Sequence, residues 1–299
     1  MTTFRVLATA VCLALSLGAG QAAARCAEHA PGQKPQNTAR DIVGADLDTI
    51  QDRGWIEFAV YADFPPYSWE EGGQPKGVDI GIGRIIAEAL EVKPRFNFVD
   101  AGENLDADLR NNVWKGPLVS GRASNVMLHV PYDSEYACRV EQVVFTGQVY
   151  AESIAIAYRK DAYPEDKPVP AYFRFDTVAV ENDTIADFYL TRLAGGQLAG
   201  NIRRFPSYAD AMAALASGEV KAAMGPRGQL EHGLTDALDL HAPPLPGFGR
   251  GAWTLGVAIR HTWRPLAYAV DYAIEEALAD GRIEAVFADH GLTFQPPVR

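Results

Sequence analysis

The chain has 299 residues and a formal net charge of −11 at pH 7, with 38 acidic side chains against 27 lysines and arginines. Because a nucleic-acid site must neutralise phosphates, this balance and the absence of a basic run argue against nucleic-acid binding. The surplus acid suits a soluble protein and is compatible with a basic partner, and the length suits two domains.

Residues 1–24 have the pattern of a secretory signal peptide, with Arg5, an apolar run and a small-residue cleavage site at residues 22–24. A membrane anchor is the alternative, but the run is shorter than the roughly 20 apolar residues that span a bilayer. We therefore expect a cleaved signal, a periplasmic mature protein and no other membrane span. Cleavage removes Arg5 and no acid, which changes the net charge from −11 to −12.

Two cysteines remain in the mature chain, Cys26 and Cys138. In an oxidising compartment a disulfide between them is the default expectation, with two separate buried thiols as the alternative. Residues 25–40 are polar and contain proline, so we expect a leader pinned by Cys26. Neither a CxxC motif nor a Cys/His cluster at metal-ligand spacing occurs, and we expect no metal and no other cofactor.

The first half of the chain alternates predicted strands and helices. A short helix in 47–53 ends at Gly54 and precedes a strand over 56–61. Apolar residues at three- and four-residue steps predict a helix over 78–90. A strand in 93–101, a helix in 105–116 and a strand over 126–130 follow. This order favours an α/β unit with parallel strands.

A second unit of similar size follows. Strands are predicted in 153–160, 176–181 and at the end of 201–226, and "AWTLGVAIR" (252–260) is another. Ser207 is positioned to cap a helix. The tail forms two predicted helices separated by Gly281. Two α/β units with a helical tail indicate a bilobed molecule.

The stretch "VYADFPPYSW" (60–69) contains two prolines among aromatic residues. Pro65 and Pro66 exclude both a helix and a central strand at this point, so the rings are held at a rigid edge. From the residues alone this edge is either a platform for a ligand or a well-packed corner.

The order of motifs resembles that of family-3 extracellular solute-binding proteins, the receptors of ABC importers. Three stretches carry the resemblance: "YADFPPYSW…GVDIGIGRIIAEAL", "YADAMAALASGEVKAAM" and "LGVAIRHTWRPLAYAVDYAIEEALADGRIEAVFADHGL". It implies a bilobed periplasmic-binding-protein (type II) fold, with two α/β lobes joined by two hinge strands. Lobe 1 would comprise residues 41–149 and 254–299, lobe 2 residues 150–253, and the crossings would lie near 146–153 and 253–255.

The resemblance also implies a ligand cleft between the lobes. Its candidate residues are Tyr61, Asp63, Phe64, Tyr67, Trp69, His129, Arg139, Glu152, Asn182, Thr184 and Arg227. By its spacing from Phe145, Arg139 falls on the position that clamps a ligand carboxylate in amino-acid receptors. The turn that contains Asn182, Asp183 and Thr184 either contacts a ligand or simply caps the next helix.

Several positions depart from the amino-acid receptors. Where these receptors place an aspartate for the ligand ammonium, this chain has Pro226, and the nearby Lys221 and Arg227 are cations that cannot take that role. Asn125 stands in place of an acid in lobe 1. We therefore expect no tight binding of the standard α-amino acids.

One branch of the fold matches better. "RNNVWKG…VMLHVPYD" and the paired cysteines resemble the J-protein branch (MoxJ and XoxJ), which accompanies PQQ-dependent methanol dehydrogenases. The matching residues are Arg110, Asn111, Asn112, Trp114, Lys115, His129, Pro131 and Asp133. This resemblance implies a non-catalytic accessory role in activation or maturation of a lanthanide- or calcium-type methanol dehydrogenase, which would be the partner. The alternative is the substrate-binding receptor of an ABC importer, with a small organic solute or a peptide segment in the cleft.

A few proteins of this fold are enzymes, so we looked for catalytic patterns. Glu152 is the one carboxylate worth testing as an acid or base, with His129 and Asp133 as neighbours. Five other histidines are scattered and predicted to lie on the surface or in loops: His29, His232, His241, His261 and His290. No Ser/His/Asp arrangement, phosphate-binding glycine loop or HExxH helix occurs. We expect a binding protein rather than an enzyme.

Overall fold

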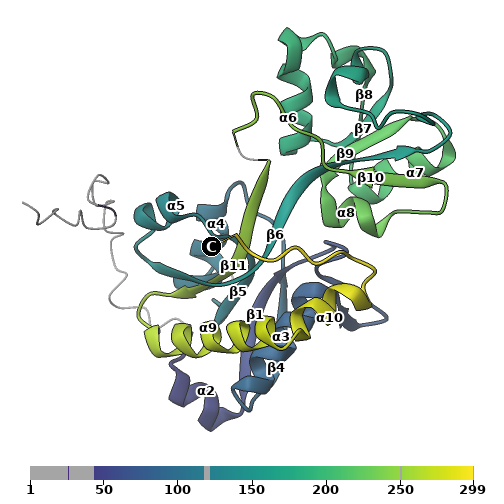
Figure 1. Cartoon of the computed structure of the whole chain (residues 1–299). Helices are drawn as coiled ribbons and strands as arrows, with labels where there is room; N and C mark the ends of the chain where they lie inside the picture. The colour runs from purple at the N-terminus through teal and green to yellow at the C-terminus, as the bar shows by residue number, and fades with distance from the viewer. Residues whose placement is uncertain (1–25, 27–43, 118–121, 250, 299) are drawn as a thin grey trace, which may run out of the picture.

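The computed structural model describes residue 26 and residues 44–117, 122–249 and 251–298. It has two lobes, with strands β6 and β11 extending between them (Figure 1). The predicted signal and all of the leader except Cys26 lie outside the described residues. In the described ranges, no helix is long and apolar enough to cross a membrane.

Lobe 1 is built on five strands. Strand β1 (Trp55–Tyr61) pairs in parallel with β4 (Lys93–Val99) and with β5 (Val126–Pro131). Strand β11 (Ala252–Arg260) lies antiparallel to β5 and to the first part of β6 (Val143–Arg159). The three parallel strands therefore match the prediction, and the returning strand β11 closes the sheet toward lobe 2.

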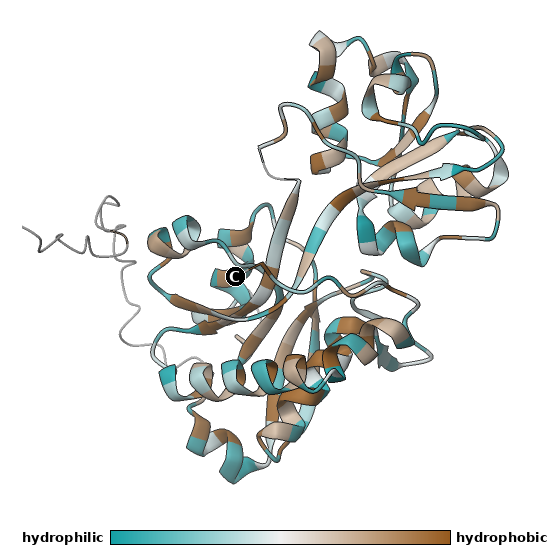
Figure 2. Cartoon of the chain, in the orientation of Figure 1, coloured by the Kyte–Doolittle hydropathy of each residue, from teal (hydrophilic) through white to brown (hydrophobic). Residues whose placement is uncertain are grey.

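Helices cover both faces of this sheet. One face carries α2 (Leu47–Arg53), α3 (Val78–Ala89), α9 (Arg264–Ala279) and α10 (Arg282–Asp289), whose apolar residues join one core cluster. The other face carries α4 (Leu105–Leu109), the π-helix η1 (Arg110–Trp114) and α5 (Ser134–Arg139). In Figure 2 the strands are largely brown, whereas α9 alternates teal with brown, as expected for a helix with one buried face.

Lobe 2 is a smaller α/β layer. Its strands are the second part of β6, β7 (Val178–Glu181), β8 (Ile202–Phe205), β9 (Ala222–Pro226) and β10 (Leu238–His241). Its helices are α6 (Ile185–Arg192), α7 (Tyr208–Ser217) and α8 (Arg227–His232), with short 3₁₀ turns η2 (Pro170–Arg174), η3 (Leu193–Gly196) and η4 (Ala199–Asn201). Strand β8 lies at the edge of the sheet.

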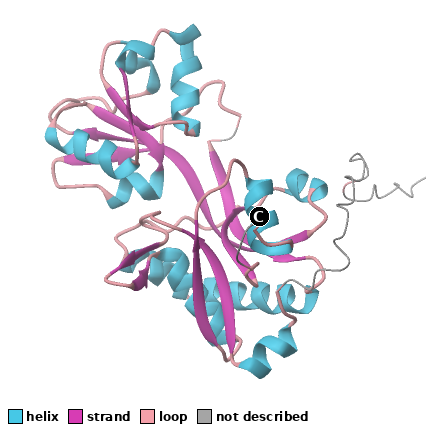
Figure 3. Ribbon diagram, turned by 180° about the vertical axis from the view of Figure 1, so that it is seen from behind, coloured by secondary structure: helices cyan, strands magenta, loops and turns pink. Residues whose placement is uncertain are grey.

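The strand order is β4-β1-β5-β11-β6-β9-β7-β8, and β10 pairs with the other side of β6. Strand β6 is 17 residues long. It pairs with β11 up to Ser153 and with β9 from Ile154, so a single strand belongs to both lobes (Figure 3). The sequence analysis predicted a crossing near 146–153 and a separate strand in 153–160. The apolar pattern alone does not indicate that these two segments form one continuous strand. Where one lobe ends and the other begins stays a prediction.

Local signals were accurate at several ends of elements. Ser207 caps α7 by accepting a hydrogen bond from the Asp210 amide at 3.1 Å, as predicted. Gly281 separates the two tail helices. The sequence analysis missed the hairpin of β2 (Trp69–Glu71) and β3 (Gln74–Lys76), and also α5 and β10. All four are six residues or shorter, too short for a hydrophobic period to be visible.

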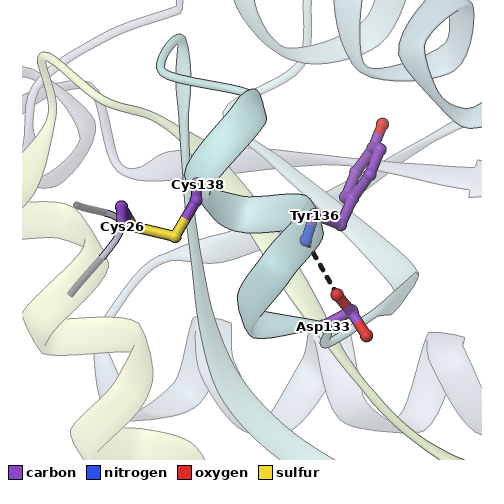
Figure 4. The surroundings of a disulfide bond; sticks show 4 residues. All are labelled: Cys26, Asp133, Tyr136 and Cys138. Atoms are coloured by element: carbon purple, nitrogen blue, oxygen red, sulfur yellow. Dashed lines mark hydrogen bonds between the residues drawn. A yellow bond between two sulfur atoms is a disulfide. The ribbon is translucent and has the colours of Figure 1, made fainter. Parts of the chain in front are cut away.

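A disulfide joins Cys26 to Cys138, which confirms that prediction. Cys138 lies in α5, and Figure 4 shows its sulfur bonded to Cys26 while the Tyr136 ring points away from the bond. Asp133 caps α5 through a 2.7 Å hydrogen bond from the Tyr136 amide. The short helix is therefore anchored at its first turn by a cap and near its end by a covalent bond.

Candidate functional site

The junction between the lobes is centred on Glu152. This residue lies on β6, one residue before the last that pairs with β11, and its side chain is 5% exposed. Its Oε1 accepts hydrogen bonds from the amides of Ser153 (2.7 Å) and Arg227 (3.0 Å). Its Oε2 accepts from the Gly228 amide (3.4 Å) and from the Tyr67 hydroxyl. One carboxylate thus connects the hinge strand, a loop of lobe 1 and the first residues of α8 in lobe 2.

Tyr67 reaches this carboxylate from the double-proline corner of lobe 1, and it is 1% exposed. The corner is a tight turn: the Phe64 amide donates to the Ser68 carbonyl at 2.8 Å, and the Tyr67 amide donates to the Phe64 carbonyl at 2.9 Å. A side chain at Gly228 would clash with the Tyr67 hydroxyl. The corner therefore directs one ring into the junction, and glycine at position 228 makes room for it.

A run of buried aromatic and polar side chains continues from Tyr67 into lobe 1. The Tyr67 ring lies 4.4 Å from the His129 ring, and Phe64 meets that imidazole edge-on at 5.0 Å. His129 Nδ1 lies 3.3 Å from the Tyr150 hydroxyl and 3.2 Å from Asp79 Oδ2. Contacts thus connect α3 of lobe 1 to α8 of lobe 2, and we call these five residues, together with Glu152, the junction cluster.

Burial shifts the pKa of three groups in this cluster, Glu152, Tyr67 and Tyr150. It raises the pKa of Glu152 above its ordinary value, and the hydrogen bonds from Tyr67 and from backbone amides oppose that rise. Burial and the neighbouring Glu152 carboxylate raise the pKa of Tyr67 well above its ordinary value. Burial likewise raises the pKa of Tyr150. Both tyrosines therefore stay protonated and act as hydrogen-bond donors at neutral pH.

The structure brings together four of the predicted side chains: Phe64, Tyr67, His129 and Glu152. Sequence reasoning missed Asp79, Tyr150 and Gly228. Asp79 lies in the quoted stretch "GVDIGIG" and Tyr150 lies two residues before Glu152, so both stood beside recognised motifs. No linear pattern, however, pairs them with His129.

Two other predicted aromatic residues lie at the edges of the cluster. The Tyr61 hydroxyl donates to Asp108 at 2.8 Å, and its ring meets Phe64 at 6.0 Å. The Trp69 ring lies 6.0 Å from His232 of α8 and 6.1 Å from His290, which follows α10. Trp69 therefore lies where the two lobes face each other. Asp63, at the corner itself, adopts a left-handed backbone conformation with φ +46°.

The turn before α6 is held by its own hydrogen bonds. Thr184 Oγ1 accepts from the Asp187 amide at 3.4 Å and donates to the Glu181 carbonyl at 2.7 Å. The Asn182 side chain donates to Asp183 at 2.6 Å. The capping role weighed for this turn is therefore present, and an anion placed there would face the carboxylates of Asp183 and Asp187.

Three further residues have roles away from the cluster. Asn125 accepts hydrogen bonds from Arg53 (2.8 Å) and from the Glu57 amide (3.0 Å), which is a structural role. The Arg227 guanidinium pairs with Glu231 at 2.7 Å, so only its backbone amide joins the junction. Arg139 is the last residue of α5, about 9 Å along that helix from its start, and it lines a different pocket.

Little empty space remains inside the cluster. The cavity beside Asp79, His129 and Tyr150 is about 10 Å³, which is at the lower limit for one water molecule. A groove of about 220 Å³ lies between Pro65 of lobe 1 and helices α7 and α8 of lobe 2. The polar part of the junction is thus filled by the chain itself, while an apolar groove stays open. Within the described ranges, no three His, Cys, Asp or Glu side chains are placed to hold a metal ion.

No family model matches the chain, and no curated protein does either. Among solved structures it is similar to an ancestral cationic amino acid solute-binding protein (AncCDT-1), with a TM-score of 0.67 and 20% identity over 82% of this chain and 99% of that one. The fold is that of a bilobed periplasmic solute-binding protein. The predicted fold class is therefore confirmed.

Two further solute-binding proteins show the same fold. An amino acid ABC transporter substrate-binding protein from Streptococcus pneumoniae bound to L-arginine has a TM-score of 0.59 and 17% identity, over 82% of this chain and 97% of that one. The solute receptor for L-cysteine of Neisseria gonorrhoeae has a TM-score of 0.56 and 18% identity, over 82% and 93%. At these identities the likeness concerns the fold, and the ligand has to be argued from the site.

Proposed function

We propose that this chain is a periplasmic solute-binding protein that holds a small organic solute between its lobes and presents it to an importer. The observation that carries the proposal is the junction of Glu152, Tyr67 and the first amides of α8. Proteins of this fold close around a ligand that contacts both lobes. Here the Glu152 carboxylate contacts both lobes, through Tyr67 and through the first amides of α8. A bound solute would replace the Tyr67 hydroxyl as the hydrogen-bond donor to Glu152.

The charges around the junction favour a cationic solute. Glu152 and Asp79 are buried carboxylates, and the faces of Phe64 and Tyr67 attract cations. The Arg227 guanidinium is already paired with Glu231. A solute carboxylate would therefore enter beside two acids without a free guanidinium among the residues described there, whereas an amine or guanidinium would meet a carboxylate. The acidic chain also attracts cations at long range.

This site differs from one that recognises α-amino acids. Pro226 ends β9 where an acid for the α-ammonium is expected, and Arg139 lies in a separate pocket. A buried ammonium or carboxylate without a partner is strongly unfavourable. The structural neighbours described as arginine-bound share the fold with this chain. Because the partners for an α-amino acid are missing here, we propose that this chain binds a solute that lacks an α-carboxylate.

Agmatine and arginine provide a matched test, because they differ only in the carboxylate. Calorimetry should show agmatine binding to the mature protein, with arginine at least tenfold weaker. Glu152→Gln should weaken agmatine by about 10- to 100-fold, the loss expected for a hydrogen bond to a charged group. The exposed Glu165→Gln is the control and should bind as the wild type does. Micromolar binding of arginine would instead support a receptor for amino acids. If neither compound binds, the proposal of a cationic solute is wrong.

An accessory role toward a PQQ-dependent methanol dehydrogenase is the second candidate. It is supported by the resemblance of residues 110–115 and by a junction that is closed by the chain's own side chains, as suits a scaffold. The neighbours reported above are solute-binding proteins, so the receptor is the better-supported of the two. A strain lacking this chain should keep its dehydrogenase activity and lose uptake of one solute if the receptor proposal holds. Lost dehydrogenase activity, and weaker co-purification of Trp69→Ala with the enzyme, would favour the accessory role.

We propose a binding role rather than catalysis. AncCDT-1 is also described as a precursor of cyclohexadienyl dehydratase, so this fold is compatible with enzymes. The described groups that donate to Glu152 are three backbone amides and the Tyr67 hydroxyl, whose pKa is raised well above its ordinary value. Such groups do not exchange protons readily at neutral pH, so they suit binding better than acid–base catalysis.

A further inference from the structure

A second pocket lies on the flank of lobe 1, with a volume of about 340 Å³. We call it the flank pocket; its lining residues are Asp106, Trp114, Tyr136, Arg139, Val140 and Gln142. Its lining shares no residue with the junction cluster. Gln142 immediately precedes Val143, where β6 begins, and Glu152 is nine residues further along that strand. At about 3.3 Å per residue, roughly 30 Å of strand separates Val143 from Glu152.

The cation of the flank pocket, Arg139, has no acidic partner among the described residues. The Arg139 guanidinium lies 5.5 Å from the centre of the Tyr136 ring, and no carboxylate of the described residues lies within ion-pair distance of it. Asp106, the acid in the lining, accepts a hydrogen bond from the Tyr136 hydroxyl instead. An arginine beside an aromatic ring and without an acid can pair with the carboxylate of a ligand.

Trp114 is brought to this pocket by an unusual local backbone. The Lys115 amide donates to the Arg110 carbonyl, five residues back, at 2.9 Å. Such π-helical turns are rare and are found frequently at functional sites. The turn consists of the "RNNVW" residues that the sequence analysis singled out, and the junction cluster uses none of them. Trp114 and Tyr136 are the two aromatic residues of the lining.

The helix that carries Tyr136 and Arg139 is held in place. Asp133 caps its first turn, and the disulfide to Cys26 anchors it one residue before Arg139 (Figure 4). The Tyr136 ring points away from the disulfide. A pocket whose side chains are already positioned loses less entropy when it binds a ligand.

From these observations we propose that the flank pocket is a second binding site, for a small aromatic monocarboxylate. The Arg139 guanidinium pairs with the carboxylate in a two-pronged hydrogen bond. The ring of the ligand packs against Trp114, Tyr136 and Val140. The pocket volume lies at the lower end of the range for small-molecule sites. Because Asp106 also faces the pocket, a second anionic group on the ligand is disfavoured.

Phenylacetate and phenylacetamide are suitable probes, because they have the same aromatic ring and size and differ in the negative charge. Calorimetry on the mature protein should show binding of phenylacetate and none of phenylacetamide. Arg139→Gln should weaken phenylacetate by about 10- to 100-fold. Arg139→Lys keeps the positive charge but cannot donate two parallel hydrogen bonds, so it should weaken phenylacetate binding less than Arg139→Gln does. Arg192→Gln is the matched control, since Arg192 is an exposed arginine in the last turn of α6.

Thermal unfolding monitored by circular dichroism should show that both Arg139 variants fold as the wild type does, since Arg139 is exposed. The proposal is overturned if the wild type does not bind phenylacetate, if Arg139→Gln binds it as tightly as the wild type, or if phenylacetamide binds equally well. Loss of binding in Arg192→Gln would point to a general charge effect and would also overturn it.

Discussion

The junction cluster and the flank pocket use charge in opposite ways. At the junction, the Glu152 carboxylate is buried and receives four hydrogen bonds from its own chain. In the flank pocket, Arg139 is exposed and lacks an acid among the described residues. A charged group that is hydrogen-bonded by its own chain connects parts of the fold, and a ligand can contact it only by displacing one of those donors. A charged group without such partners, such as Arg139 among the described residues, can pair with a ligand without displacing anything.

The largest expected effect comes from removing the disulfide that anchors the flank pocket. The bond closes a loop of 112 residues, so Cys26→Ser with Cys138→Ser should lower the free energy of unfolding by about 2–4 kcal/mol. Urea denaturation measures this loss. Mass spectrometry of the non-reduced wild type should find two fewer hydrogens and no free thiol. Two alkylatable cysteines in the wild type would contradict the prediction.

The next effect concerns the junction. Glu152→Ala leaves the Tyr67 hydroxyl and three amides without their acceptor, and should lower the free energy of unfolding by about 3 kcal/mol. Tyr67→Phe removes one donor and should cost about 1 kcal/mol. The double variant should be less destabilised than the sum, because both changes break the same contact. Simple additivity would mean that the two side chains do not interact.

Gly228 tests the same contact from lobe 2. Gly228→Ala places a methyl group against the Tyr67 hydroxyl and should destabilise the protein by about 1–2 kcal/mol. Gly200→Ala is the control, because a methyl group there meets nothing within 4 Å and should change stability by less than about 0.5 kcal/mol. Equal stability of the two variants would show that Tyr67 does not approach α8 as described.

The smallest effect is a dependence on pH. Burial raises the pKa of Glu152 above 4.5 in the folded state, so its contribution to stability is present below that pH and declines as the pH rises through the folded pKa. Between pH 4.5 and 7, the wild type should therefore lose stability relative to Glu152→Gln, which cannot titrate. Urea denaturation across this range measures the difference. A constant difference would indicate that the pKa of Glu152 is not raised.

The sequence predicted the architecture better than the site. Apolar spacing located α3 and the strands of lobe 1, because these elements are long enough to repeat a period several times. Glu152 was found because it falls at the hinge. Its partner Gly228 was not, since Gly228 meets it only where β6 and α8 come together. Tyr150 was not, since its role depends on its contact with His129 of β5. Arg139 was placed in the cleft by its spacing from Phe145, but residues 134–139 form helix α5 and Arg139 is the last residue of that helix.

The central claim is that the two sites are separate and of opposite charge preference, and a crossed titration tests it most directly. Agmatine and phenylacetate are each titrated into the wild type, Glu152→Gln and Arg139→Gln. The account predicts that Glu152→Gln loses agmatine and keeps phenylacetate, whereas Arg139→Gln loses phenylacetate and keeps agmatine. One variant that loses both ligands would contradict it, because both compounds would then depend on a single site.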